Sequence, residues 1–330
     1  MGTALRRFGV LAGGDDYPGL NAVIRAAVLR GAQDHEAEFV GFVDGWRGVL
    51  DAQTIELDWR AVRGIAGAAG TVLGAAPRFE GAGPVDVDVV ETGVRASNLD
   101  GLLMIGGAET IGMADRLRED GIPVVVVPAS VENCLPCAES ALGFDTVVGI
   151  AVEAMARLRA IGEAQQQCTI AEVIGRDAGW IALHAGLAAG ADVVLVPEWP
   201  QTSEQIRKRM VLSGRRGHLL VVAESFGLAA EGGVERGAGP RLRHIIESHT
   251  GAEPLVSGLA AVQRGASPSP ADRVLAARLG YGAADALLGN CHGTMVTMSA
   301  DELQVIPLSE HQSKRTVSRD HYRRFEALLG

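Results

Sequence analysis

Runs of consecutive apolar residues alternate along the chain with amphipathic segments of helical spacing. The apolar runs predict strands at 8–11, 102–105, 124–127, 170–174, 193–196 and 219–223. The amphipathic segments predict helices at 19–32, 147–158 and 273–288, one ending near Leu117 and one beginning near Gly179. Unbroken apolar strands are typical of parallel sheets covered on both faces. The β–α order therefore predicts an α/β fold with doubly wound sheets.

Two of the strand-to-helix turns are rich in glycine. The first reads GGDDYPGLN from Gly13 to Asn21, and the second reads GGAET from Gly106 to Thr110. Glycine lets a backbone approach a polyphosphate closely, and the N-terminus of the following helix offers N–H groups to it. Open parallel sheets bind their ligands beyond the carboxyl ends of the strands. On spacing alone, ordinary tight turns of an α/β fold remain the favoured interpretation.

Composition and charge narrow the range of functions. The chain has 330 residues, which is enough for two domains with a substantial core. Its formal net charge of −10 argues against binding to nucleic acid or to an anionic membrane. The N-terminal segment lacks the apolar region of a signal peptide, and no apolar run is long enough to span a bilayer. Four cysteines are too few for a disulfide scaffold, so the cytoplasm is the expected compartment.

Segments spread over nearly the whole chain resemble the bacterial-type phosphofructokinases that use ATP or pyrophosphate. The matching segments are GVLAGGDDYPGLNAVIRAAV, GLLMIGGAETIGMADRL, PVVVVPASVENCLPCAESALGFDTVVGIAVEAMARL, AEVIGRDAGWIALHAGLAAGADVVLVPE and LAAVQRGASPSPADRVLAARLG. The resemblance implies a phosphofructokinase-like α/β fold of two doubly wound lobes with mainly parallel sheets. It implies a donor-binding lobe of 1–142 plus 263–312 and an acceptor-binding lobe of 143–262 plus 313–330. It also implies Mg²⁺ with ATP or pyrophosphate as the phosphoryl donor, and assembly into a homotetramer or homodimer.

The family moves a terminal phosphoryl group onto a sugar hydroxyl, and the first aspartate of its TIDND motif takes the hydroxyl proton. The resemblance places Glu132 at that position, Ser130 at the threonine and Cys134 at the second aspartate. Glutamate can act as a general base, but its carboxylate lies roughly one bond further from the backbone than that of aspartate. A displacement of a catalytic group by ~1 Å can reduce a rate about a hundredfold. Arg176 of the IGR segment is also present, and the resemblance implies a catalytic role for it.

The donor side carries several substitutions. The resemblance implies that the donor phosphates contact Gly14, Asp16, Arg78, Gly106, Gly107, Glu109 and Thr110. Ala108 replaces the carboxylate that the family uses near Mg²⁺, and Glu109 occupies a position that is normally small. Glu109 either disfavours ATP, as an acid does in pyrophosphate-dependent relatives, or supplies the magnesium carboxylate. The first turn aligns in two ways: Asp15 replaces the second glycine, or a gap marks Asp16 or Tyr17 as an insertion.

The acceptor side separates into retained and lost groups. The resemblance implies acceptor contacts at Ser130, Ile174, Gly175, Glu224 and Arg264, which serve the sugar hydroxyls. The family clamps the sugar 6-phosphate with two arginines and a histidine, and those positions hold Gln167, Leu255 and Ala261. Each lost charge-assisted hydrogen bond is worth roughly 1.5–3 kcal/mol. We therefore expect the acceptor to be a sugar or polyol without the 6-phosphate, in a reaction of secondary metabolism.

Two alternatives stay open. Because Ala108 and Cys134 replace aspartates, an inactive binding or regulatory protein that keeps the fold is the first alternative, ranked slightly below the phosphotransferase. Different chemistry in the same pocket, using Cys134, is the other. Cys134 and Cys137 form a CxxC, but no second CxxC or histidine lies nearby in the sequence to complete a zinc site. A substituted active-site loop is favoured over a redox or metal role.

Overall fold

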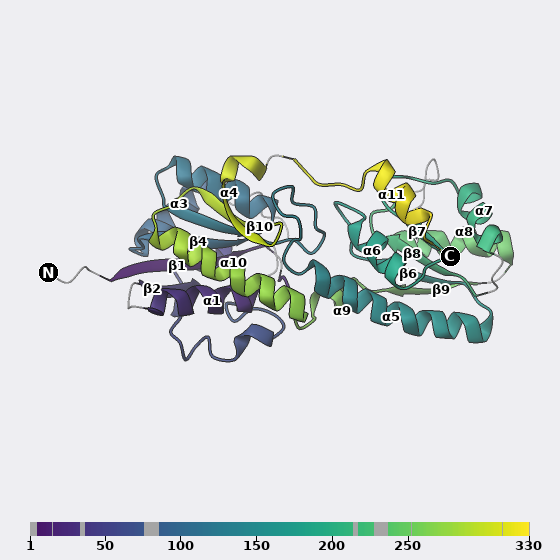
Figure 1. The fold of residues 1–330 in the computed structure, drawn as a ribbon, viewed down its shortest axis with the longest axis horizontal. Helices are drawn as coiled ribbons and strands as arrows, with labels where there is room; N and C mark the ends of the chain where they lie inside the picture. Colours follow the sequence, from purple (N-terminus) through teal and green to yellow (C-terminus); the bar gives the residue numbers. More distant parts are fainter. Residues whose placement is uncertain are drawn as a thin grey trace. The chain divides into compact units, whose positions relative to one another are not determined.

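The computed structural model describes residues 5–14, 16–33, 37–75, 86–213, 217–227, 237–251, 253–311 and 313–329, without the side chains of 211–213, 249–250 and 311. The chain divides into two compact units, most of whose elements are labelled in Figure 1. Unit 1 comprises Met1–Val131, Leu135–Gly143 and Ser267–Lys314. Unit 2 comprises Glu132–Cys134, Phe144–Ala266 and Arg315–Gly330.

Unit 1 is built on a seven-stranded sheet in the order β11-β10-β5-β4-β1-β2-β3. Its strands are β1 (Arg6–Gly13), β2 (Ala37–Phe42), β3 (Thr54–Glu56), β4 (Gly101–Gly106), β5 (Val124–Pro128), β10 (Thr294–Ser299) and β11 (Glu302–Pro307). The inner strands pair in parallel, whereas the edge strands β3 and β11 are antiparallel to their neighbours. The sheet is therefore mainly parallel, as the unbroken apolar runs predict.

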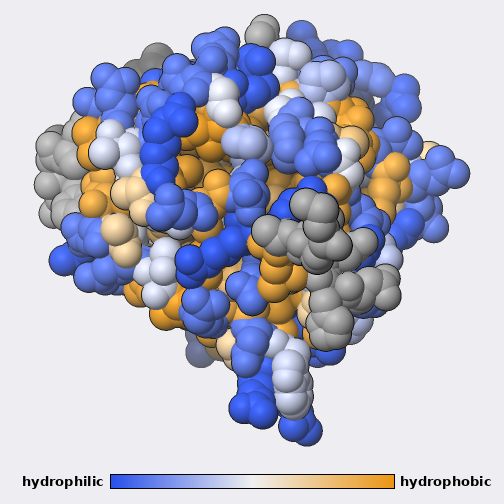
Figure 2. Space-filling view, turned by 90° about the vertical axis from the view of Figure 1, so that its left-hand side faces the viewer, coloured by the Kyte–Doolittle hydropathy of each residue, from blue (hydrophilic) through white to orange (hydrophobic). Residues whose placement is uncertain are grey.

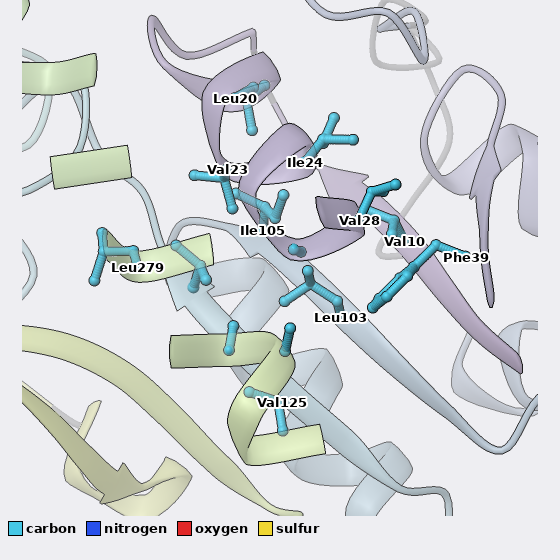
Figure 3. Packing of buried hydrophobic residues seen from close by; sticks show 14 of the residues in the cluster. Val10, Leu20, Val23, Ile24, Val28, Phe39, Leu103, Ile105, Val125 and Leu279 are labelled. Atoms are coloured by element: carbon cyan, nitrogen blue, oxygen red, sulfur yellow. The ribbon is translucent and has the colours of Figure 1, made fainter. Parts of the chain in front are cut away.

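Helices cover both faces of this sheet. They are α1 (Leu20–Ala32), α2 (Trp46–Leu50), α3 (Val87–Ala96), α4 (Ala108–Glu119) and α10 (Pro270–Leu288), with the 3₁₀ turns η2 (Ile65–Gly67) and η3 (Leu308–His311). On the face of α1 and α10, the strand residues Val10, Leu103 and Val125 pack against Val23 and Leu279 (Figure 3). The alternate strand residues pack with α3 and α4 on the other face: Leu11, Leu102, Met104, Val124 and Val126. Successive side chains of a strand point to opposite faces, so this alternation makes unit 1 doubly wound.

Unit 2 contains a four-stranded parallel sheet in the order β7-β8-β6-β9. Its strands are β6 (Thr169–Val173), β7 (Val193–Leu195), β8 (Leu219–Ala223) and β9 (Leu255–Gly258). Its helices are α5 (Phe144–Gln165), α6 (Trp180–Ala188), α7 (Ser203–Ser213), α8 (Ala238–Thr250), α9 (Ala260–Arg264) and α11 (Arg319–Glu326). Ile170, Leu220 and Val222 pack with Leu242 and Ile246 of α8, and α5 and α6 contact β6 and β8.

The division into units departs from the expected lobes at 132–134, 143, 263–266 and 313–314, and hydrogen bonds explain the first and third differences. The segment 132–134 belongs to unit 2 because Glu132 accepts hydrogen bonds from backbone groups of that unit. Helix α9 belongs to unit 2 because the buried amide of Gln263 bonds to Ile174 and Val147. Donor and acceptor roles for the two units stay predictions.

The surface and the helices bear on membrane association. Figure 2 shows a face covered largely by hydrophilic residues, with hydrophobic patches exposed among them. Within the described ranges, none of the helices combines the length and apolar character that crossing a bilayer requires.

Candidate active site

The two glycine turns lie side by side at the carboxyl edge of the unit 1 sheet. Strands β1 and β4 are parallel neighbours, and Gly13 pairs with Gly106. A Cβ atom at Gly106 would lie 2.2 Å from the carbonyl oxygen of Gly13, so a larger residue cannot fit there. The buried Thr110 hydroxyl donates a hydrogen bond of 2.8 Å to the same carbonyl. Thr110, expected to contact the donor, thus joins the two turns.

The backbone of both turns suits an anion. Gly14 has φ of 102°, a conformation that side chains disfavour. Gly107 is the N-cap of the 12-residue helix α4, so the first N–H groups and the positive end of the helix dipole face this turn. Asp15 and Arg78 lie outside the described residues. The predicted donor residues Gly14, Asp16, Gly106, Gly107, Glu109 and Thr110 all belong to unit 1.

A carboxylate of the first turn has an unusual environment. The Oδ1 atom of Asp16 is buried without a hydrogen-bond partner, and burial raises the pKa of this carboxyl group. The segment beside it is held by Asn21, whose side chain donates to Gly70 O at 3.0 Å and accepts from Val72 N at 2.7 Å. A Cβ atom on Gly70 would lie 3.7 Å from Oδ2 of Asp16. Asn21 and its loop were not among the expected site residues.

The carboxylates of unit 1 can be compared with the ligands that the expected magnesium ion requires. Among the described residues there is no group of three or more His, Cys, Asp or Glu side chains suited to a metal. Mg²⁺, however, is usually bound by one or two carboxylates together with substrate phosphates and water. The orphaned Oδ1 of Asp16 and the carboxylate of Glu109, in the first turn of α4, fit that second type of site.

The expected base, Glu132, has a defined position in unit 2. Its Oε2 atom accepts hydrogen bonds from Asp177 N at 2.7 Å and Ala178 N at 3.2 Å. Burial raises the pKa of the Glu132 carboxyl group, the two N–H groups oppose that rise, and the charges of Asp177 and Glu224 add to it. A carboxylate with a raised pKa is better matched to proton transfer near neutral pH.

The expected hydroxyl-binding residues meet at the carboxyl edge of the unit 2 sheet. Ile174 and Gly175 follow β6, and Glu224 follows β8, its parallel neighbour. Ser225 fastens the two turns, because its Oγ donates to Gly175 O at 2.5 Å. Glu224 is half-buried, and the neighbouring Arg176 is exposed. The remaining expected contacts are Arg264, half-buried at the end of α9 in unit 2, and Ser130, buried in unit 1.

Gln263 positions this edge and was missed from the sequence. Its side chain is fully buried, with Oε1 accepting from Ile174 N at 3.1 Å and Nε2 donating to Val147 O at 3.1 Å. Helix α9 is thereby bonded to the residue after β6 and to α5. These bonds fix the backbone position from which the Arg264 side chain extends. The only sequence signal was its place between two residues of a recognised motif, VQR.

A C-terminal segment of unit 2 holds the loop that carries Glu132. Arg315 N donates to Cys134 O at 2.8 Å, and Trp180 Nε1 donates to Arg315 O at 3.1 Å. Glu198 accepts from Gly179 N and, at 2.9 Å, from Val317 N. These bonds connect Cys134, two residues after Glu132, with the start of α6. The segment's role was not predicted, because nothing in its sequence identifies a backbone contact.

The expected phosphate-clamp positions carry no cationic side chain. Gln167 donates through Nε2 to Glu253 O at 2.5 Å, just before β6. Leu255 begins β9 and pairs with Thr169 at the amino end of β6. Ala261 is exposed on α9. Gln167 and Leu255 thus lie at the amino edge of the sheet, opposite to Ile174 and Glu224 within unit 2.

The two cysteines of the CxxC are shielded from solvent. Neither forms a disulfide, Cys134 is buried, and Cys137 is half-buried. Burial raises the pKa of the Cys137 thiol to about 11, so it is protonated at neutral pH. Reactive cysteines have lowered pKa values instead. These observations weigh against the redox interpretation of the CxxC.

Comparisons with known proteins agree with the motifs. The family model described as Phosphofructokinase matches residues 7–287. The pyrophosphate–fructose 6-phosphate 1-phosphotransferase of Amycolatopsis methanolica is 39% identical, covering 98% of this chain and 100% of that relative. ATP-dependent 6-phosphofructokinase 3 of Streptomyces coelicolor is 37% identical with the same coverage. The crystal structure of a pyrophosphate-dependent phosphofructokinase from Marinobacter aquaeolei, 21% identical, has a TM-score of 0.82 and covers 99% of this chain and 92% of that one, which shows the fold. The chain belongs to the phosphofructokinase family.

Proposed function

We propose that this chain is a cytoplasmic phosphotransferase that moves the terminal phosphoryl group of ATP or pyrophosphate onto a hydroxyl of a sugar-like or polyol acceptor. The observation that carries the proposal is the Glu132 carboxylate, held by two backbone N–H groups beside Glu224. Glu132 takes the hydroxyl proton as the acceptor oxygen bonds to phosphorus and the bond to ADP or phosphate breaks. Glu224 and Arg264 orient the acceptor, and Arg176 supplies positive charge.

The donor belongs to unit 1 in this proposal. The backbone of Gly14, Gly106 and Gly107 cradles its phosphates, aided by the N-terminus of α4. Asp16 and Glu109 would hold Mg²⁺ together with the phosphates. The ion, when bound, neutralises charge on the phosphoryl group during transfer.

The proposed acceptor lacks a 6-phosphate. The relatives above are named for fructose 6-phosphate or as 6-phosphofructokinases. Here Gln167, Leu255 and Ala261 offer no charge to a phosphate dianion, whereas the groups that face hydroxyls are kept. Losing three charge-assisted contacts of roughly 1.5–3 kcal/mol each would weaken a phosphorylated acceptor by orders of magnitude.

The test compares phosphorylated and unphosphorylated acceptors with both donors. Purified protein is assayed with Mg²⁺ and ATP or pyrophosphate against fructose 6-phosphate, free sugars, cyclitols and nucleosides. We expect turnover of an unphosphorylated polyol. We also expect that Ala261→His combined with Gln167→Arg and Leu255→Arg lowers the KM for fructose 6-phosphate by about tenfold per restored contact. Val262→His, at an exposed neighbouring position, is the matched control. Turnover of fructose 6-phosphate in preference to every unphosphorylated acceptor refutes the acceptor proposal.

A second candidate is an inactive binding or regulatory protein. It is supported by Ala108 and Cys134, which replace the two aspartates that serve metal-assisted transfer in the family. Calorimetry with magnesium pyrophosphate and magnesium ATP, followed by the acceptor assay, separates the two candidates. Binding of a donor without turnover of any acceptor would favour the second.

We also propose that the chain assembles with itself, as a homotetramer or homodimer. Gln167 and Leu255 lie at the sheet edge opposite to the hydroxyl-binding residues, so clamp groups there would serve a site in a neighbouring copy. Sedimentation velocity of the full chain tests this, and a monomer at micromolar concentration would contradict it.

A further inference from the structure

Tyr17 lies in the first glycine turn, and its side chain reaches across that turn. The ring is half-buried and packs on the hydrophobic cluster beneath α1 and α10. A Cβ atom on Gly14 would lie 3.4 Å from Tyr17 Oη, and one on Gly107 would also lie 3.4 Å from it. One hydroxyl therefore sits in front of both glycine turns of unit 1.

This position coincides with the space that the two glycines leave open. Glycine at a phosphate-binding turn removes a side chain so that phosphate oxygens can reach the backbone N–H groups, about 2.7–3.2 Å from the nitrogen. A phenol oxygen in van der Waals range of the Cβ positions of Gly14 and Gly107 occupies that approach. A donor phosphate and the Tyr17 hydroxyl cannot both lie there.

The remaining polar groups of the turn act in the same direction. The partly buried carboxylate of Asp16 precedes Tyr17, and Glu109 lies in the first turn of α4. Both negative charges oppose a bare polyphosphate, so the donor has to arrive as its magnesium complex. Asp16 can then contribute to the metal, whereas Tyr17, which has no charge to offer a cation, has to move.

We propose that Tyr17 controls donor affinity: its side chain fills the phosphate cradle between Gly14 and Gly107 and must swing out before a donor binds. The inference rests on the proposed function of unit 1 as the donor site. It assigns to Tyr17 a direct control over donor affinity. Affinity is reduced by the fraction of molecules in which the cradle is open. If the open form is about a tenth of the population, freeing the cradle raises affinity about tenfold.

The test measures binding of magnesium pyrophosphate and magnesium ATP by calorimetry, without any acceptor. The variants are Tyr17→Phe, Tyr17→Ala and deletion of Tyr17, with Tyr281→Ala on the exposed side of α10 as the control. We expect Tyr17→Ala and the deletion to bind at least one donor about tenfold more tightly or better. Tyr17→Phe should stay near the wild-type affinity because its ring still fills the cradle. Thermal melts identify which variants are folded. If Tyr17→Ala is not folded, the deletion variant is used in its place.

Each possible result either supports or overturns the inference. Weaker binding in both Tyr17→Phe and Tyr17→Ala overturns the inference, because the hydroxyl would then be a ligand of the phosphate. Equal affinity in all folded variants also overturns it while leaving the donor function of unit 1 intact. Binding by Tyr17→Ala but not by the wild type supports it and counts against donor use by the natural chain. No binding by any folded variant overturns both.

Discussion

Replacing Glu132 by glutamine should slow catalysis strongly without weakening the fold. The amide oxygen of glutamine can accept the same two hydrogen bonds from Asp177 N and Ala178 N that the carboxylate accepts. It cannot take a proton, and loss of a general base costs typically 10²–10⁴-fold in rate. We therefore expect the turnover number of Glu132→Gln to fall by about 10²–10⁴ with little change in donor affinity.

The pKa of Glu132 fixes the sign of the stability change. Burial raises that pKa above its ordinary value of 4.5, so the charged form is less favourable in the folded protein than in the unfolded chain. This cost is absent below the unfolded pKa and fully present above the folded pKa. Glu132→Gln should therefore match the wild type near pH 4 and become relatively more stable as the pH rises towards neutrality.

An alanine variant isolates the structural role. Glu132→Ala leaves the buried Ala178 N–H without its acceptor, while the half-buried Asp177 N–H can be hydrated. An orphaned buried donor costs about 1–3 kcal/mol, and each kcal/mol lowers the melting temperature by about 2–4 °C in a domain of this size. We expect Glu132→Ala to melt below Glu132→Gln by roughly 2–12 °C.

Phosphoryl-transfer assays and calorimetric melts of the two variants check these values, with the exposed Glu153→Gln on α5 as the control. Wild-type turnover in Glu132→Gln would refute the role of Glu132 as base. A Glu132→Ala variant as stable as Glu132→Gln would instead refute the structural part of the reasoning.

Three further outcomes follow from the hydrogen bonds and ring contacts. Gln263→Leu orphans Ile174 N–H, so unfolding should become easier by about 1–3 kcal/mol and the acceptor KM should rise with donor affinity unchanged; denaturant titration and kinetics check both. Burial, His321 and Arg315 lower the pKa of His184 below 6.5, so wild-type stability should fall as the pH drops below that value, and His184→Phe should remove the dependence. Ser269→Ala deletes the N-cap of α10 and should cost about 1 kcal/mol, measured by urea unfolding; no change would contradict the capping role.

The main sheet strands were predictable because they are buried on both faces. The runs at 102–105, 124–127 and 219–223 match β4, β5 and β8 to within a residue at either end. Strands β2, β3, β9, β10 and β11 were missed. Of these, β3, β9 and β11 contain no buried residue, so no apolar run identifies them. Helix α5 also begins earlier than expected, at Phe144, because its first turn continues directly from the loop after Gly143.

Only those residues of the candidate site that stand in recognisable sequence motifs could be proposed from the sequence. Glu132, Glu224 and the glycines were proposed as site residues from their place in motifs, and their roles stay predictions. The contacts that position them were not proposed, because a buried amide such as Gln263 or a backbone bond such as Arg315 N to Cys134 O has no signature in a single sequence. The placement of Tyr17 in front of both turns likewise depends on the pairing of β1 with β4, which joins turns that are far apart in the chain.

The positions of the lost acceptor groups contribute less to the stability of the fold than the positions of the retained groups. Glu132 is bonded to the backbone, and Arg264 directly follows a fully buried glutamine. Ala261 is exposed, and the side chain of Gln167 bonds to a surface carbonyl at the edge of the sheet. A change at such clamp positions costs little stability, because surface substitutions usually alter it by less than about 0.5 kcal/mol. The fold can therefore lose its phosphate clamp and keep its hydroxyl-binding edge intact, which is the combination that a change of acceptor requires.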